Sequence, residues 1–82
     1  MHICVVAHGL LTVAVQHPGG VVELAVPGGT DIQGLLEALY NISPVFDPRS
    51  TPIVVIDGAQ VPLSQTLCGG ETVHLYPIFG GG

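Results

Sequence analysis

The sequence has no lysine and a single arginine, Arg49, and charged residues make up only 9% of its 82 residues. An average domain has roughly 25%. Six acidic residues bring the net charge to −5. Because nothing in such a chain neutralises phosphates, we expect no nucleic-acid partner and no binding to an anionic membrane surface. The acidity suits docking onto a basic protein, or it serves solubility alone.

Long apolar runs and cysteine-rich motifs are also missing. No apolar stretch reaches the roughly 18 residues that span a bilayer, and the first four residues lack the positive charge of a signal peptide. The only cysteines, Cys4 and Cys68, have no CxxC spacing. We therefore expect a cytoplasmic protein with reduced, inert thiols. A single disulfide between them stays open, since the sequence does not give their distance.

The chain is instead rich in turn formers and apolar residues. It has 12 glycines and 7 prolines, and 48% of its residues are hydrophobic. That content argues against a disordered or collagen-like chain, and the length leaves room for one small domain. With so few charges, the surface must carry neutral and apolar side chains, some of which we expect to meet a partner.

Alternating and continuous apolar residues predict five strands, at 3–7, 21–26, 53–56, 60–61 and 72–76. In the last strand Val73 and Leu75 share one face, while Thr72, His74 and Tyr76 share the other. The run at 53–56 is typical of a central strand buried on both sides. Asp57-Gly58 predicts a two-residue hairpin turn after it. Residues 8–20 are ambiguous between strand and loop.

A helix is predicted to start at Thr30. Thr30 and Gln33 have the capping-box spacing, and Asp31 sits in the first turn, where the helix dipole favours an acid. One apolar stripe follows, at Ile32, Leu35, Leu36 and Leu39. So short a helix must be held by packing on a sheet. Residues 41–52 hold three prolines and are expected to form a loop, and 63–67 a short connector or one helical turn.

This order of elements predicts a two-layer α+β fold, with the first and last strands side by side in the middle of the sheet. No metal site is expected, because the histidines lack ligand spacing and each fits a surface or satisfied role: His2, His8, His17 and His74. Gly28-Gly29 precedes the helix but lacks the lysine and spacing of a phosphate loop, so we interpret it as a turn. No catalytic triad or carboxylate pair is evident.

The chain ends in Gly80-Gly81-Gly82. Three glycines form a thin, flexible thread that can enter a narrow channel, and the final carboxylate is the distinctive reactive group. A frayed terminus is the plain alternative. The combination of this ending with the strand–helix pattern is the strongest functional signal in the sequence.

Several segments, covering nearly the whole chain, resemble the ubiquitin-like sulfur carriers of bacteria and archaea, of the molybdopterin synthase small subunit and thiamine sulfur carrier (MoaD/ThiS) type. These segments are 22–30, 34–39, 54–58, 67–73 and 75–82. The resemblance implies a β-grasp fold, a mixed sheet of four to five strands with one main helix packed on one face. It also implies a folded domain at 1–79 and a flexible glycine tail at 80–82.

The same resemblance implies a function in which the protein is not itself an enzyme and binds no cofactor. An activating adenylyltransferase of the ubiquitin-activating type uses ATP to adenylate the Gly82 carboxylate. A sulfur donor converts it to a thiocarboxylate. That group then gives its sulfur to a molybdopterin synthase large subunit or to a thiazole synthase. Gly80 and Gly81 would thread the channel, while Pro77, Ile78 and Phe79 orient the tail.

Alternatives stay open within this resemblance. Length and Pro77 favour the molybdopterin type, whereas the triple glycine is closer to some thiamine carriers. Phe79 is expected to be an apolar anchor for a partner, or else to pack back onto the sheet. A modifier joined through Gly82 to a target lysine and an interaction domain whose tail is never activated are the rival classes.

Overall fold

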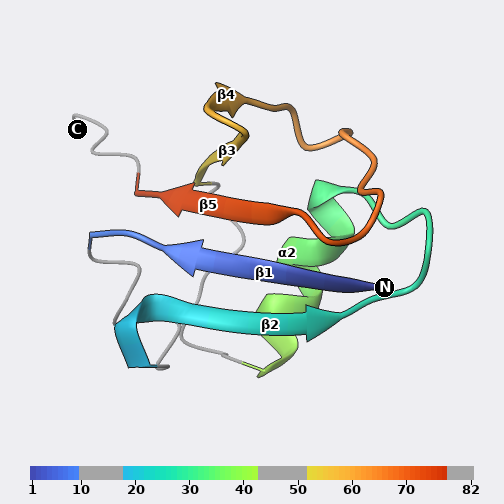
Figure 1. Ribbon diagram of the computed structural model, residues 1–82, viewed down its shortest axis with the longest axis horizontal. Helices are drawn as coiled ribbons and strands as arrows, with labels where there is room; N and C mark the ends of the chain where they lie inside the picture. Colours follow the sequence, from blue (N-terminus) through green and yellow to red (C-terminus); the bar gives the residue numbers. More distant parts are fainter. Residues whose placement is uncertain (10–17, 43–51, 78–82) are drawn as a thin grey trace.

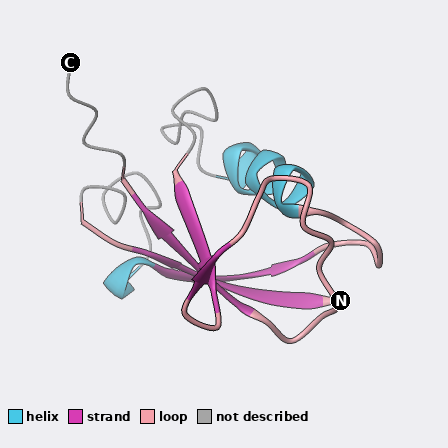
Figure 2. Cartoon of the chain, turned by 90° about the horizontal axis from the view of Figure 1, so that it is seen from above, coloured by secondary structure: helices cyan, strands magenta, loops and turns pink. Residues whose placement is uncertain are grey.

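The computed structural model describes residues 1–9, 18–42 and 52–77. Along the chain its elements are β1 (His2–Ala7), the short turn η1 (Pro18–Gly20), β2 (Val21–Ala25), α2 (Ile32–Ile42), β3 (Ile53–Ile56), β4 (Ala59–Gln60) and β5 (Thr72–Tyr76). The strands form one sheet, and α2 lies against one of its faces (Figures 1 and 2). This confirms the predicted two-layer α+β fold.

The sheet has the order β2-β1-β5-β3-β4. β1 runs parallel to β5 and antiparallel to β2, whereas β3 is antiparallel to both β5 and β4 (Figure 1). The register sets Val6 of β1 beside His74 of β5, and Tyr76 of β5 beside Ile53 of β3. The first and last strands therefore lie side by side in the middle of a mixed sheet, as predicted.

One face of the sheet and one side of α2 enclose the hydrophobic core. Alternate residues of the central strands point to the helix, so that Val5, Val73 and Leu75 are fully buried. The helix contributes the predicted stripe, all of it buried: Ile32, Leu35, Leu36 and Leu39. Each such side chain contributes about 1.5–3 kcal/mol by leaving water. This packing holds a helix of 11 residues that would not be stable alone.

The helix starts one residue later than predicted. Asp31 is its N-cap, because the Asp31 Oδ1 accepts a hydrogen bond from the Gly34 amide at 2.9 Å. The Thr30 hydroxyl donates instead to the Pro27 carbonyl at 2.7 Å. The capping-box prediction at Thr30 is therefore wrong, since the turn that precedes the helix engages the Thr30 side chain. The same turn confirms the interpretation of Gly28-Gly29.

The connector between β4 and β5 satisfies further amides at the start of α2. The Ile32 amide donates to the Gln65 carbonyl at 3.0 Å, and the Gln33 amide to the Leu63 carbonyl at 3.1 Å. Residues 63–67 form a turn and an isolated bridge rather than a turn of helix. Their carbonyl groups thus replace the water that would otherwise bind the exposed amides of a helix start.

The hairpin between β3 and β4 has the predicted turn. Asp57 and Gly58 have φ values of 53° and 78°, the positive values that a type I′ turn requires. The expectation that β3 is buried on both sides is wrong, because only its Val54 is buried. The reason is that α2 covers one face of the sheet, whereas no element of the described ranges covers the opposite face, which we call the open face (Figure 2).

Two predicted loops fall partly outside the described residues. α2 continues to Ile42, two residues into the segment expected to be a loop, and the rest of that segment up to residue 51 is not described. The ambiguous stretch at 8–20 is described only at its two ends. In the described ranges no helix is long and apolar enough to cross a membrane.

Candidate functional site

The tail of the chain follows directly on the central strand β5. Tyr76 ends that strand, and Pro77 is the last residue described. β5 is held on both sides up to this point, because Tyr76 pairs with Ile53 of β3 and the Leu75 carbonyl accepts the His8 amide at 2.9 Å. Five predicted site residues lie beyond the described part: Ile78, Phe79, Gly80, Gly81 and Gly82.

Gly9 packs against the start of the tail. Its φ of 59° lies in the left-handed region that favours glycine. A Cβ atom at Gly9 would lie 3.1 Å from the Cγ of Pro77, closer than such contacts normally are. Pro77 itself is half-buried. The point from which the tail leaves the sheet is therefore fixed by a contact with the chain that follows β1.

Three aromatic side chains lie together beside this point, and we call His8, His74 and Tyr76 the ring cluster. The His8 Nε2 and the His74 Nδ1 are 2.9 Å apart and share a hydrogen bond. The rings of His8 and Tyr76 are stacked, with centroids 4.3 Å apart and planes within 3° of parallel. The cluster joins β5 to the residue that follows β1.

The ring cluster results from the parallel pairing of β1 with β5. Because Val6 lies opposite His74, the next residue on the same face, His8, comes level with Tyr76. The sequence correctly predicts that His74 and Tyr76 share a face. It does not reveal the cluster, because His8 belongs to the ambiguous stretch. The predicted pairing of the first and last strands was not enough to find it, because the register that sets Val6 beside His74 comes only from the structure.

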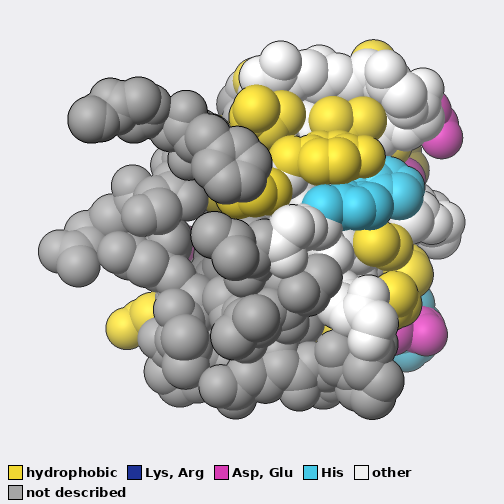
Figure 3. Space-filling model, turned by 90° about the vertical axis from the view of Figure 1, so that its left-hand side faces the viewer, with side chains coloured by type: hydrophobic (Ala, Val, Ile, Leu, Met, Phe, Trp, Pro, Cys, Tyr) yellow, Lys and Arg dark blue, Asp and Glu magenta, His cyan; other side chains and the backbone are white. Residues whose placement is uncertain are grey.

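Aliphatic side chains surround the ring cluster on the open face of the sheet. The alternation of buried residues in each strand places Val6, Val21, Ile53 and Val55 on this face. Val21 is 47% exposed and Tyr76 is 38% exposed. Figure 3 views the molecule from the end where β1 and β5 finish, with histidine side chains among hydrophobic ones. This is a largely neutral surface next to the start of the tail.

The charges on the open face lie away from the ring cluster. The Nδ1 of His2 and the Oε1 of Glu23 lie 3.4 Å apart, a contact that is an ion pair only when His2 is protonated, and the two side chains are 74% and 69% exposed. An exposed pair of this kind contributes little to stability. The described ranges contain no lysine or arginine, because Arg49 lies outside them. The described part of the face that borders the tail therefore carries no lysine or arginine.

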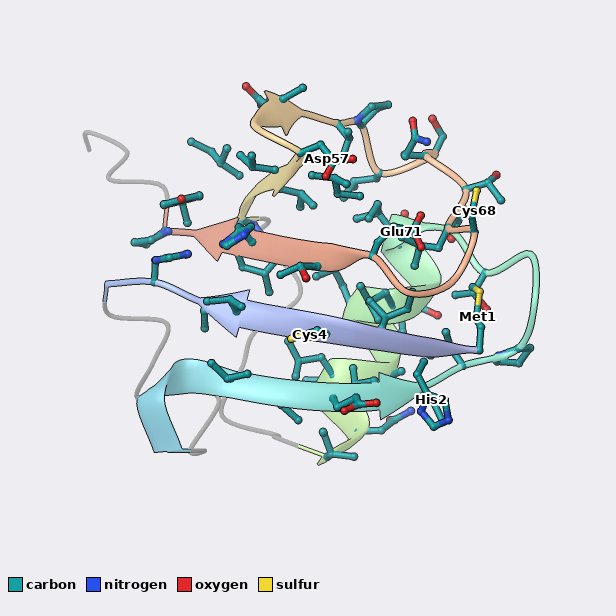
Figure 4. The ribbon with its side chains drawn as sticks, in the orientation of Figure 1. Met1, His2, Cys4, Asp57, Cys68 and Glu71 are labelled. Carbon is teal, nitrogen blue, oxygen red and sulfur yellow. The ribbon has the colours of Figure 1, made fainter. Side chains whose placement is uncertain are left out.

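A loop that contains Cys68 lies at the end of the sheet opposite to the one from which the tail leaves (Figure 4). The Glu71 carboxylate accepts the amides of Cys68 and Gly69 at 2.8 and 2.6 Å. Cys4 lies midway along β1, and both cysteines are free thiols. Neither is placed at the end of the sheet from which the tail leaves.

No metal centre is present in the part of the chain that the structure describes. Within residues 1–9, 18–42 and 52–77, no three side chains of His, Cys, Asp or Glu gather so that they could hold a metal ion. His8 and His74 share a hydrogen bond with each other, and His17 lies outside the described residues. The chemical candidates are therefore the open face and the tail that follows Pro77.

Comparison with known proteins finds likeness in structure rather than in sequence. Neither a protein-family model nor a curated protein matches the chain. SAMP1 from Haloferax volcanii matches with a TM-score of 0.83 at 19% identity, with all of both chains covered. A putative molybdopterin converting factor subunit 1 from Pyrococcus furiosus gives 0.79 at 16% identity, covering 93% of this chain and 95% of the other.

The chain has the ubiquitin-like β-grasp fold of these proteins. One chain in the structure of a complex of subunits 1 and 2 of molybdopterin-converting factor from Helicobacter pylori also matches, with a TM-score of 0.66 at 15% identity, and the match covers all of this chain and all of that chain. Identities this low establish the fold and not the activity. The predicted resemblance to the molybdopterin-type carriers is thus confirmed at the level of fold.

Proposed function

We propose that this protein is a sulfur carrier in molybdopterin biosynthesis and that the Gly82 carboxylate carries the sulfur. The observation that carries the proposal is a β-grasp domain whose central strand leads through Pro77 into a sequence ending in three glycines. The structural neighbours named as molybdopterin converting factor subunits support it.

The chemistry proceeds in two stages, adenylation of the Gly82 carboxylate and then its conversion to a thiocarboxylate. An adenylyltransferase of the ubiquitin-activating type binds the domain and ATP, and a Gly82 carboxylate oxygen attacks the α-phosphorus while pyrophosphate leaves. The terminal sulfur of a donor persulfide then attacks the acyl carbon and displaces AMP. A thiol cleaves the resulting S–S bond and releases the Gly82 thiocarboxylate, which is a nucleophilic sulfur.

Each part of the chain has a distinct role in this proposal. The domain is the surface that partners bind, and Gly80 and Gly81 thread a channel that side chains would block. Ile78 and Phe79 orient the tail between Pro77 and these glycines. The large subunit of molybdopterin synthase receives the sulfur, in line with the two-subunit complex among the neighbours. Thiazole synthase is the alternative acceptor.

A second function is favoured by a specific neighbour. SAMP1 is named a small archaeal modifier protein in a second structure of it, which matches with a TM-score of 0.80 at 19% identity. In that case the activated Gly82 carbonyl forms an amide with a lysine of a target protein. Both functions share the adenylation of Gly82, and they differ in whether sulfur or an amine displaces AMP.

The intact mass of the protein purified from its own cells separates these functions. A gain equal to one oxygen-to-sulfur exchange, mapped to Gly82, is the expected result. Adducts joined to lysines of other proteins, without that exchange, would assign the modifier function instead. The same spectrum establishes whether the natural chain ends at Gly82.

Deletion of Gly82 provides the matched test in vitro. ATP–pyrophosphate exchange by the cognate adenylyltransferase should be lost, while the fold is kept, because the described core ends before the tail. Exchange that continues without Gly82 would refute both functions. Sulfur transfer from the thiocarboxylate form to the molybdopterin synthase large subunit, and not to thiazole synthase, would then fix the pathway.

A further inference from the structure

The strand β2 lies at one edge of the sheet. It pairs with β1 on one side, and no strand of the described residues pairs with its other side (Figure 1). It contains no proline or lysine, and its register with β1 runs without a bulge from Val21 to Ala25. Natural proteins commonly use proline, lysine or a bulge to block such an edge. The backbone of β2 is therefore open to pairing with a further strand.

The pairing of β1 with β2 determines which backbone groups face outward. Met1 and Val26 exchange both of their backbone hydrogen bonds, at 2.8 and 2.9 Å. In an antiparallel pair, such bonded positions alternate with positions that make no bond to the neighbouring strand. Cys4 is at a position of the second kind, since its amide donates to the Glu71 carbonyl on the side of β5. Its partner Glu23 therefore directs its N–H and C=O away from β1.

The same alternation applies to the residues two positions before and after Glu23. Val21 and Ala25 lie opposite Val6 and His2, also at positions without bonds to β1. All three residues of β2 are exposed, and their outward groups have no hydrogen-bond partner among the described residues. They are about 7 Å apart along the strand, the repeat at which one strand bonds to another. The edge thus presents a row of donors and acceptors.

The side chains of β2 determine what kind of strand fits this edge. Glu23 lies at its centre and is 69% exposed, with Val21 and Ala25 on either side of it on the same face. The residue of an added strand directly opposite Glu23 has its side chain on that face, so lysine or arginine is favoured there. On the other face, the core residues Val22 and Leu24 are each 7% exposed, and side chains of the added strand would cover them.

A second copy of this chain fits the edge poorly. Two β2 strands paired antiparallel about an axis at Glu23 would place two carboxylates directly opposite each other, which is destabilising. β2 contains no basic residue, and the whole chain has no lysine and a net charge of −5. A partner that supplies a positive charge is therefore a different protein.

We propose that the outer edge of β2 binds an extended segment of another protein as an added antiparallel strand, with lysine or arginine opposite Glu23 and apolar residues opposite Val21 and Ala25. Main-chain hydrogen bonds supply the affinity and these side chains the specificity. β1 lies between β2 and β5, the strand that leads to the tail (Figure 1). This edge is thus separate from the start of the tail, and the proposal does not depend on the reaction of Gly82.

A synthetic peptide tests the charge preference. The probe is the capped peptide Thr-Val-Thr-Lys-Thr-Val-Thr, whose lysine lies opposite Glu23 when its valines lie opposite Val21 and Ala25. In an NMR titration, the amides of these three residues should shift more than those of the residues between them. The same peptide with glutamate in place of lysine should bind more weakly, and Glu23→Lys should reverse that preference. An unchanged preference, or no shift along β2 with the lysine peptide, would overturn the proposal.

Methylation of peptide amides separates strand addition from simple charge attraction. Methyl groups on the lysine and valine amides should abolish binding, because these amides face β2, whereas methyl groups on the threonine amides between them should not. Equal binding of the two methylated peptides, or the reverse order, would contradict an added antiparallel strand. A dimer of the protein alone, with β2 amide shifts that depend on its concentration, would assign the edge to a second copy instead.

Variants of the protein complete the design. Ala25→Pro removes an outward amide that β1 does not use and should weaken peptide binding, whereas Ala25→Val keeps that amide and should bind as the natural protein does. Peptide binding should be unchanged by deletion of Gly82. The outcome at β2 is therefore independent of whether Gly82 is adenylated, and either proposal can fail without the other.

Discussion

The two faces of the sheet differ in their side chains and in whether α2 covers them. The covered face is buried by α2, and the buried residues described on it are aliphatic, among them Val5, Val73 and Leu75. The open face presents the ring cluster, valines and the exposed contact between His2 and Glu23. The same strands supply both, because successive residues point to opposite sides. Burial of the covered face thus stabilises the domain, whereas the described residues of the open face contribute less buried area.

This difference separates stability from function within a very small domain. A chain of 82 residues has little surface, and under the proposed function that surface would be presented to more than one enzyme. Substitutions on the covered face should therefore lower the stability of the fold, and those on the open face should chiefly alter partners. The predictions below test how sharply the two faces are separated.

The largest expected effect lies on the covered face. Leu35→Ala or Leu36→Ala should lower the free energy of unfolding by about 2–5 kcal/mol, because each removes a buried side chain and leaves a cavity. Tyr40→Ala is the control on the same helix, since Tyr40 is 42% exposed, and should change the stability far less. Denaturant unfolding measures all three. Similar losses for Tyr40 and the leucines would mean that the helix is not packed as described.

An intermediate effect is expected where the covering helix begins. Asp31→Ala should cost about 1 kcal/mol, because the Gly34 amide loses its acceptor. Thr30→Val is the matched control, since it removes a hydroxyl that bonds only to the preceding turn, and should cost less. Thermal unfolding of both variants measures which substitution costs more stability. A larger loss for Thr30 would restore the capping-box prediction made from the sequence.

The covered face could be predicted from the sequence, whereas the ring cluster could not. Burial on one side spaces apolar residues every 2 positions in a strand and about every 3.6 positions in a helix. The sequence therefore predicts that Val73, Leu75 and the apolar stripe of α2 are buried. The cap was misplaced because Thr30 and Asp31 are both good capping residues, and the turn at Pro27 decides between them. The cluster depends on a contact between His8 and His74, 66 residues apart, which no local pattern contains.

A small effect is expected for the cysteines, although one of them lies on the open face. Replacing both Cys4 and Cys68 by serine should leave sulfur transfer intact and change the stability by about 1 kcal/mol or less. In the proposed function the sulfur travels on the Gly82 carbonyl, and neither thiol is placed beside the start of the tail (Figure 4). Transfer is measured from the thiocarboxylate form. A large loss with an unchanged fold would assign the chemistry to a cysteine.

No effect at all is expected in an assay for self-conjugation, because neither face presents a reactive amine. The chain has no lysine, and the Met1 ammonium is partly buried and donates a hydrogen bond to the Val26 carbonyl at 2.8 Å. The Met1 nitrogen has to leave this hydrogen bond before it can attack an acyl group. An acyl-adenylate at Gly82 therefore has no acceptor on a second copy of the chain.

Incubation with the adenylyltransferase and ATP, without other proteins, should accordingly give no ladder of linked copies on a denaturing gel. A variant with one added lysine, Gln33→Lys on the exposed side of α2, is the control that reveals whether an available amine would be captured. Capture only in the variant would mean that lack of an amine protects the adenylate until sulfur arrives. A ladder in the natural protein, with fragments that join Gly82 to another copy, would contradict the prediction and favour the modifier function over the carrier.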